Sequence, residues 1–299
     1  IGRNFIDLED IDDGYNIHVM YVIPADGVDK EYDLNSKISM LLYQIDNWFN
    51  SKTKDRLYID GQNLKFDRKE DGKIDITFLR LEKKDNEISK EGIQAVNVLQ
   101  PSISSHGFNN PKKVYFIVYG GSNRDVCASS QLPSYATEGI IANSAALYYP
   151  GKRSGSCIDN NGGFKPEFNE TAKAALHEIL HVLGAVPQCA EDHLVFASEG
   201  TINDGIGGHI AIPGDIMYSV QSNVTYDKAK HLDYKSTNYY NHNNENCLDI
   251  AKSRYVIPTV DNPQLPTFTL NDWLVGRQGW IIVPNIHLLI TKFPCLHGI

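Results

Sequence analysis

Three residues in the segment His177-Glu178-Ile179-Leu180-His181 have the types and the spacing of a hydrolytic metal site. On a helix of 3.6 residues per turn, His177 and His181 lie on one face, one turn apart. Their imidazoles can therefore bind a single Zn²⁺ at about 2.0–2.1 Å. Glu178 points to a neighbouring face, from which its carboxylate can act as general base on a water whose pKa zinc lowers to about 7. The alternative is an amphipathic helix that carries two histidines and no metal.

A catalytic zinc site usually has three protein ligands and one open position, so a third ligand is needed. Gly184 stands three residues after His181. The resulting pattern, H-E-x-x-H-x-x-G, resembles that of the metzincin metallopeptidases, in which a third histidine follows three residues after the glycine. In this chain that position is occupied by Pro187, so the family pattern does not supply the third ligand.

Two histidines further along the chain, His193 and His209, can replace it. The segment Asp215-Ile216-Met217-Tyr218 resembles the methionine turn that follows the third ligand in metzincins. Met217 lies eight residues after His209 (217 − 209 = 8), which is similar to the spacing in matrixin-type metzincins. We therefore expect His209 to be the third ligand, after a loop inserted over residues 185–208, with His193 as the alternative.

The resemblance is to secreted bacterial metzincin-like peptidases, and the segments HEILHVLGAVPQCAEDH, GGH and DIMY carry it. It implies a zinc-dependent endopeptidase built on a mixed five-stranded sheet with an active-site helix. It also implies that Met217 forms the hydrophobic floor of the site, and that Tyr218 and Ser219 line the pocket for a substrate side chain. The oxyanion would be stabilised by zinc itself or by a side chain further along the chain; the candidates are His231, Tyr239, Tyr240 and His242.

The apolar pattern of the first part of the chain changes between strand and helix periodicities. The expected strands are residues 16–23, 73–81, 114–119 and 144–149. The expected helices are residues 34–49 after Asp33 as N-cap, 88–99 before Pro101, and 169–183 between Asn169 as N-cap and Gly184 as stop. This order predicts an α/β (α+β) fold, a mixed sheet covered by helices.

We expect three parts in the chain. Residues 1–184 form an N-terminal zincin subdomain that includes the zinc helix. Residues 185–255 are rich in Gly, Asn, Asp and Tyr, and form a loop-rich C-terminal subdomain with the third ligand and the methionine turn. Residues 256–299 form an extension without a functional interpretation.

Composition and charge argue against several classes of protein. Of the 299 residues, 41% are hydrophobic and 22% are charged, as in an ordinary globular protein. The net charge of −9 and the absence of a Lys/Arg cluster argue against a nucleic-acid partner. No stretch reaches the roughly 18–20 apolar residues that span a bilayer. We expect a monomer that acts on a protein or peptide substrate.

The chain has five cysteines, none in a C-x-x-C pair, which favours disulfides in a secreted or periplasmic protein over a cysteine zinc site. Among the three connectivities that four cysteines allow, we favour Cys189–Cys247 and Cys127–Cys157, which leaves Cys295 unpaired. Buried thiols in a cytosolic protein are the alternative. The chain opens at Ile1 without a signal peptide, so we take it as a mature or trimmed form.

Two clusters of oxygen-bearing side chains could bind structural Ca²⁺, although neither has EF-hand spacing and solvated turns are the more common role; they are Asp10, Asp12 and Asp13, and Asp159, Asn160 and Asn161. Two other functions stay open for the chain. One is a zinc-dependent hydrolase of a non-protein substrate, and the other is a non-catalytic zinc-binding protein on a zincin scaffold. Glu178 argues against the second, because an inert site needs no base.

Overall fold

The centre of the molecule is a five-stranded sheet with the strand order β3-β1-β4-β6-β5. Its strands are β1 (Asn16–Ile23), β3 (Ile76–Arg80), β4 (Lys113–Tyr119), β5 (Ala128–Ser130) and β6 (Ser144–Tyr148). Strands β3, β1, β4 and β6 run parallel to one another, whereas β5 is antiparallel to β6. The prediction of a mixed five-stranded sheet is confirmed. The computed structural model describes residues 3–12, 14–131, 143–149, 167–187, 189–193, 208–210, 212–218, 229–245, 247–260 and 263.

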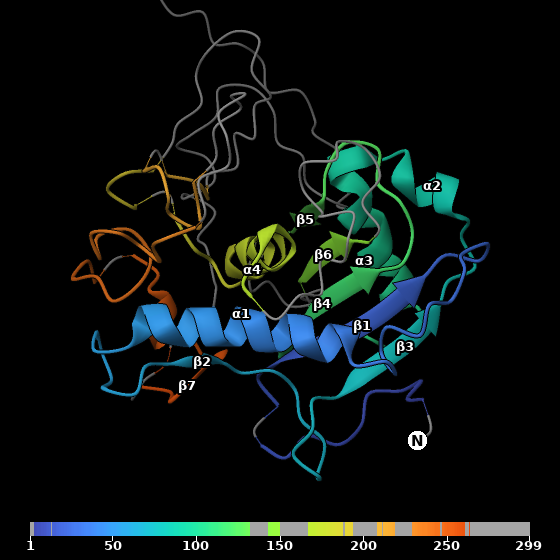
Figure 1. The fold of residues 1–299 in the computed structure, drawn as a ribbon, viewed down its shortest axis with the longest axis horizontal. Coiled ribbons are helices and arrows are strands. Elements are labelled where there is room, and N and C mark those ends of the chain that lie inside the picture. Colours follow the sequence, from blue (N-terminus) through green and yellow to red (C-terminus); the bar gives the residue numbers. More distant parts are fainter. Residues whose placement is uncertain are drawn as a thin grey trace, which may run out of the picture.

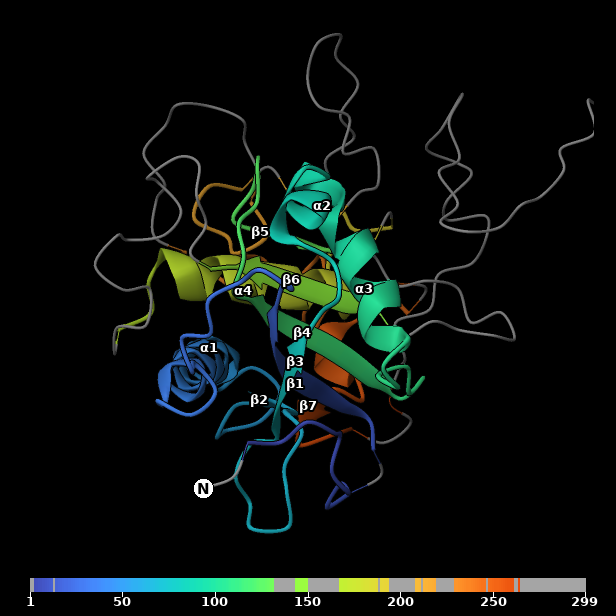
Figure 2. The ribbon, with the colours of Figure 1, turned by 90° about the vertical axis from the view of Figure 1, so that its right-hand side faces the viewer.

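Helices cover both faces of this sheet (Figures 1 and 2). One face carries α1 and α4, and the other carries α2 and α3, so that the molecule has three layers. The helices are α1 (Lys37–Thr53), α2 (Asp85–Ser89), α3 (Val96–Ser104) and α4 (Glu170–Val182), with short 3-10 turns η1 (Gly92–Ala95) and η2 (Ile250–Lys252).

Each face of the sheet has its own hydrophobic core, because successive side chains of a strand point to opposite faces. On β1, Val19 and Tyr21 pack on the side of α1 and α4, whereas Met20 and Val22 pack on the side of α3. Both β1 and β4 are buried along their whole length. This burial explains the continuous apolar run at the centre of the sheet.

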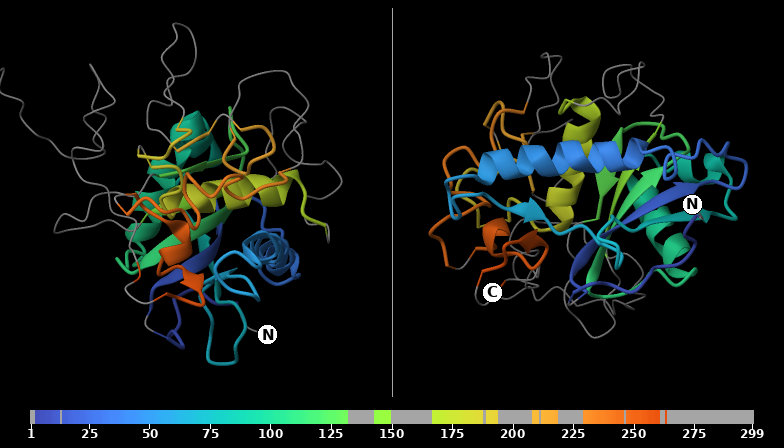
Figure 3. Two further views of the ribbon diagram at one scale, coloured as in Figure 1. Left: turned by 90° about the vertical axis from the view of Figure 1, so that its left-hand side faces the viewer. Right: turned by 60° about the horizontal axis from the view of Figure 1, so that its bottom comes forward.

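The segment from residue 229 to residue 258 packs beside the C-terminal end of α1 (Figure 3). The Arg56 guanidinium donates hydrogen bonds to the carbonyl oxygens of Leu232, at 2.6 Å, and Tyr240, at 3.2 Å. A two-stranded sheet of β2 (Asn63–Leu64) and β7 (Val256–Ile257), which the sequence did not predict, adds a second connection. The late segment is thus fastened to the first part of the chain.

The expected strands are confirmed in place and type, and so is the helix that carries His177 and His181, but the first helix begins later than predicted. It starts at Lys37, and Asp33 does not cap it. The Asp33 carboxylate instead accepts two hydrogen bonds of 2.7 Å from the Arg3 guanidinium. A long-range ion pair has therefore replaced the local cap.

The helix expected over residues 88–99 is divided into α2, η1 and α3. Gly92 has φ 56°, a left-handed conformation that interrupts a regular helix. Pro101 does not end the helix, which continues to Ser104. A proline removes one helical hydrogen bond, and the fully buried side chains of Leu99 and Ile103 hold this turn against the sheet.

Within the described ranges, no helix is both long enough and apolar enough to cross a membrane. Residues 264–299, which make up most of the expected extension, lie outside the described residues. The division of the chain into three parts stays a prediction.

Candidate metal centre

The helix that carries the motif, α4, begins and ends as its local sequence predicts. The side-chain oxygen of Asn169 accepts hydrogen bonds from the backbone N–H groups of Thr171 and Ala172. Gly184 has φ 90°, which ends the helix in a conformation that costs glycine little. The opposite face of the helix is anchored in the core by a fully buried apolar stripe, which consists of Ala175, Leu176, Ile179 and Leu180.

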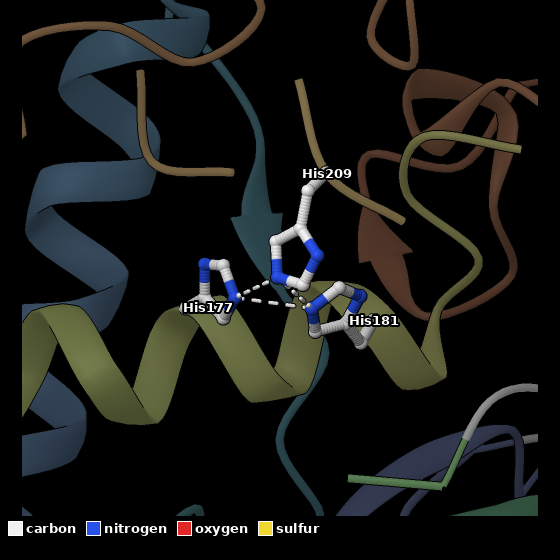
Figure 4. Close-up of side chains that lie close together, drawn as sticks. All are labelled: His177, His181 and His209. Carbon is white, nitrogen blue, oxygen red and sulfur yellow. Dashed lines mark hydrogen bonds between the residues drawn. The ribbon is translucent and has the colours of Figure 1, made fainter. Parts of the chain in front are cut away.

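The structure brings His177, His181 and His209 together, although His209 comes from a distant segment (Figure 4). The Nε2 atom of His177 lies 3.0 Å from that of His181 and 3.0 Å from that of His209. The Nε2 atoms of His181 and His209 are 3.2 Å apart. His193 is not a member of this group; its backbone pairs with Ile210, the residue next to His209.

The protonation state of His177 follows from its other ring nitrogen. Its Nδ1 atom lies 2.7 Å from the carbonyl oxygen of Ile216, and a carbonyl can only accept, so Nδ1 carries the proton. In the neutral ring, Nε2 therefore presents a lone pair to the other histidines. Burial, reinforced by His209, lowers the pKa of His177 to about 3. Burial also lowers the pKa of His181, so both rings are neutral at pH 7.

The three histidines fit a zinc ion. Neutral imidazole lone pairs that face one another repel unless a cation lies between them. Ligands at tetrahedral angles and bond lengths of 2.0–2.1 Å are about 3.3 Å apart. The observed separations of 3.0–3.2 Å are close to this value. Imidazole nitrogen is also a preferred ligand of zinc, and three such ligands leave a fourth position for substrate.

Glu178 lies beside this group and is held by a residue that the sequence analysis missed. The Ser130 hydroxyl, on β5, donates a hydrogen bond of 2.6 Å to Glu178 Oε2. Burial raises the pKa of Glu178 to about 7, although the bond from Ser130 opposes this change. The pKa of this carboxyl group therefore lies in the range in which it can both accept and release a proton near neutral pH.

Met217, in the predicted methionine turn, is fully buried. Backbone hydrogen bonds connect this turn to the site. The Met217 N–H donates to Asp215 Oδ1 at 2.8 Å, and its carbonyl accepts from the Ile210 N–H at 3.1 Å. Ile210 directly follows His209 in the sequence. Ile216 directly precedes Met217, and its carbonyl accepts the hydrogen bond from His177 Nδ1. The turn is thus connected to two of the three histidines.

Two residues were expected to line a substrate pocket after this turn. Tyr218 is half-buried, and its N–H donates to the carbonyl of Asp215 at 3.2 Å. Ser219 lies outside the described residues. The pocket roles of both stay predictions.

Three of the four side chains that were candidates to stabilise the oxyanion form hydrogen bonds with other groups. The Tyr239 hydroxyl donates to Asp215 Oδ1 at 2.6 Å, and the Tyr240 hydroxyl donates to a glutamine side chain at 2.6 Å. His242 Nε2 lies 2.9 Å from a backbone carbonyl. His231 packs its ring on a tyrosine, with the ring centroids 4.6 Å apart. The hydroxyls of Tyr239 and Tyr240 thus both donate to buried side chains. The role of each of the four candidates at the oxyanion stays a prediction.

The predicted disulfide between Cys189 and Cys247 is present, with a Cα–Cα distance of 5.7 Å. Cys127 is also disulfide-bonded. Cys157, its predicted partner, and Cys295 lie outside the described residues.

The calcium prediction has no support among the described residues. The Asp10 carboxylate lies 2.8 Å from the Lys113 ammonium group, which takes the place of a metal cation. Asp12 accepts hydrogen bonds from a backbone N–H and from the Asn16 amide. The other expected calcium ligands lie outside the described residues, namely Asp13, Asp159, Asn160 and Asn161.

A second group of metal-type side chains, which the sequence analysis also missed, consists of Asp7, His18, Asp67 and Asp75. The Lys113 ammonium lies 2.7 Å from Asp7 and 2.8 Å from Asp67. His18 Nδ1 lies 2.7 Å from the same Asp67 carboxylate. Since Lys113 already supplies the positive charge, we interpret this group as an ion-pair network that fastens the segment before β1 to the sheet. The sequence signal for this network is Lys113, a charged residue at the start of the buried strand β4.

Neither a protein-family model nor a curated protein matches this chain. Archaemetzincin from Methanopyrus kandleri is similar in structure, with a TM-score of 0.39 and 12% identity over 76% of this chain and 94% of its own. Wild-type OgpA from Akkermansia muciniphila has a TM-score of 0.37 and 12% identity over 64% of this chain and 52% of its own. Metalloproteinase-II from Bacteroides fragilis has a TM-score of 0.36 and 15% identity over 76% of this chain and 54% of its own. The chain thus spans about half the length of the last two proteins.

Proposed function

We propose that the protein is a zinc-dependent endopeptidase. In this proposal, His177, His181 and His209 bind the metal and Glu178 is the general base. The observation that carries the proposal is the convergence of three imidazole Nε2 atoms within 3.0–3.2 Å of one another, beside a buried carboxyl group. A bound zinc ion would supply Lewis-acid catalysis at this point.

The residues of the chain have distinct tasks in this proposal. Glu178 takes a proton from the attacking water and returns it to the leaving amine, a role that its raised pKa of about 7 suits. The Ile216 carbonyl fixes the orientation of the His177 ring by accepting a hydrogen bond from its Nδ1–H group. Met217 forms the floor of the site.

The position of β5 favours an extended peptide as substrate over a non-protein molecule. Among the described strands, β5 is at the edge of the sheet, and it packs against α4. A peptide that adds to a sheet edge forms backbone hydrogen bonds with it. A peptide on this edge would pass beside Glu178, because Ser130 of β5 contacts that carboxylate. Tyr218 and Ser219 would then line a pocket for one of its side chains.

Cleavage of casein tests this function. We expect cleavage by the wild type and its loss on removal of zinc by a chelator. Glu178→Gln should lower kcat by about 10²- to 10⁴-fold while it retains zinc, because it keeps the shape of the base but cannot accept a proton. Glu170→Gln, at the start of the same helix, is the matched control and should stay active. A wild type that binds zinc stoichiometrically and cleaves no peptide would contradict the proposal.

The zinc content of two variants tests the third ligand. His209→Ala should lose most of its zinc, whereas His193→Ala, which removes the other candidate, should keep it. Full zinc retention in His209→Ala would overturn the assignment.

We further infer that the protein works in a secreted or periplasmic setting, because the Cys189–Cys247 disulfide persists in an oxidising environment. The expectation of a monomer stays a prediction.

A further inference from the structure

We propose that Ser130 is a positioning residue that holds the Glu178 carboxylate in its catalytic orientation from the edge strand β5. This inference rests on the proposed peptidase function.

The contact between the two side chains is short and specific. The distance of 2.6 Å from Ser130 Oγ to Glu178 Oε2 is typical of a hydroxyl that donates to a carboxylate. Among the described residues, no other side chain donates a hydrogen bond to Glu178, and no protein donor reaches Oε1. One oxygen is thus anchored to the sheet, and the other is left for the reacting water.

The pleat of β5 explains why this serine reaches the base. Ser130 pairs with Ala145 of β6, whose side chain lies in the core on the side of α4. Ser129 pairs with Ala146 and points to the other face, where its hydroxyl lies 2.7 Å from the Tyr148 hydroxyl. Adjacent serines of one strand therefore serve opposite faces of the sheet.

A catalytic base needs such an anchor because helix α4 fixes only the backbone of Glu178. The side chain has three rotatable bonds, and each misplaced rotamer moves the carboxylate away from the water that it must deprotonate. Misplacement by about 1 Å can lower a rate by about 100-fold. The anchor belongs to the same strand along which the peptide is proposed to lie, so substrate and base are placed by one element. Removal of the Ser130 hydroxyl should therefore lower kcat and leave KM unchanged.

Three variants test this inference with casein-derived peptides. Ser130→Ala should lower kcat by about 10- to 100-fold, a part of the full contribution of a general base, with KM and zinc content unchanged. Ser130→Thr keeps the hydroxyl on a residue that suits a strand, and should restore most of kcat. Ser129→Ala is the matched control, since it removes a serine hydroxyl from the same strand, and its kcat should equal that of the wild type.

A second measurement needs no turnover. In the zinc-free protein at fixed alkaline pH, the ¹³C resonance of the Glu178 carboxylate, assigned with Glu178→Gln, should move in Ser130→Ala and stay in place in Ser129→Ala. An unmoved resonance, or a kcat within about twofold of the wild type in Ser130→Ala, overturns the inference and leaves the peptidase function standing. An equal loss in Ser129→Ala, a loss of zinc, or failure of Ser130→Thr to recover activity also overturns it. An inactive wild type overturns the proposed function and this inference together.

Discussion

Removal of the Cys189–Cys247 disulfide is expected to lower the stability of the protein without changing the zinc affinity of the folded site. The bridge joins residues separated by 58 positions in the sequence. Both His209 and Met217 lie within the loop that it closes. The perturbation is the double variant Cys189→Ser/Cys247→Ser, which leaves the disulfide of Cys127 intact.

The magnitude follows from the length of this loop. In the chain-entropy model, a cross-link that closes a loop of 58 residues lowers the entropy of the unfolded chain by about 14 cal/mol/K, or about 4 kcal/mol at 25 °C. The folded state should change little, because the Asp192 N–H donates to Asn238 Oδ1 at 2.8 Å between the same two segments. The effect should therefore arise in the unfolded state.

Urea denaturation of the zinc-free protein, followed by tryptophan fluorescence, measures the free energy of unfolding, and competition with a chromophoric chelator measures zinc affinity. We expect a loss of about 4 kcal/mol and a zinc Kd within about twofold of the wild type. Cys295→Ser, which removes the cysteine predicted to be unpaired and keeps the Cys189–Cys247 bridge, should change neither quantity. A loss below about 1 kcal/mol would refute the entropic reasoning. A tenfold weaker zinc affinity would show that the bridge shapes the native site.

Two further predictions concern the turns beside the site. Burial, the largest cause, raises the pKa of Asp215 from 3.8 to about 6, so the native state binds more protons than the unfolded state between these values and stability falls as pH rises through them. The advantage of the wild type over Asp215→Asn in unfolding free energy should shrink by about 2.4 kcal/mol from pH 4 to pH 7, and a constant difference would contradict this pKa. Gly184→Ala should lower the free energy of unfolding by about 1–2 kcal/mol in the same assay, because φ is 90° there. An unchanged midpoint would show that the turn relaxes at no cost.

The helix that carries His177 and His181 could be predicted from the sequence because its signals are local. The cap at Asn169, the apolar stripe and the stop at Gly184 all lie within one helix length, and the helical period alone puts His177 and His181 on one face. The central strands were predictable for a similar reason, since continuous burial requires a continuous apolar run. The local predictions at Asp33 and Pro101 are wrong, because at each residue a distant contact replaces a local preference.

The sequence by itself determined the types of residue that can bind a metal and the helix that presents two of them. Only the tertiary structure decided which residues join them. His209 is 28 positions from His181, and no local period relates the two. Ser130 lies on a strand of three residues without an apolar alternation, so nothing in its neighbourhood marks it. Its contact with Glu178 exists because β5 pairs with β6 in one register, which turns this serine, and not Ser129, toward the helix. Register and long-range pairing are properties of the folded sheet, and they are decided when the strands meet.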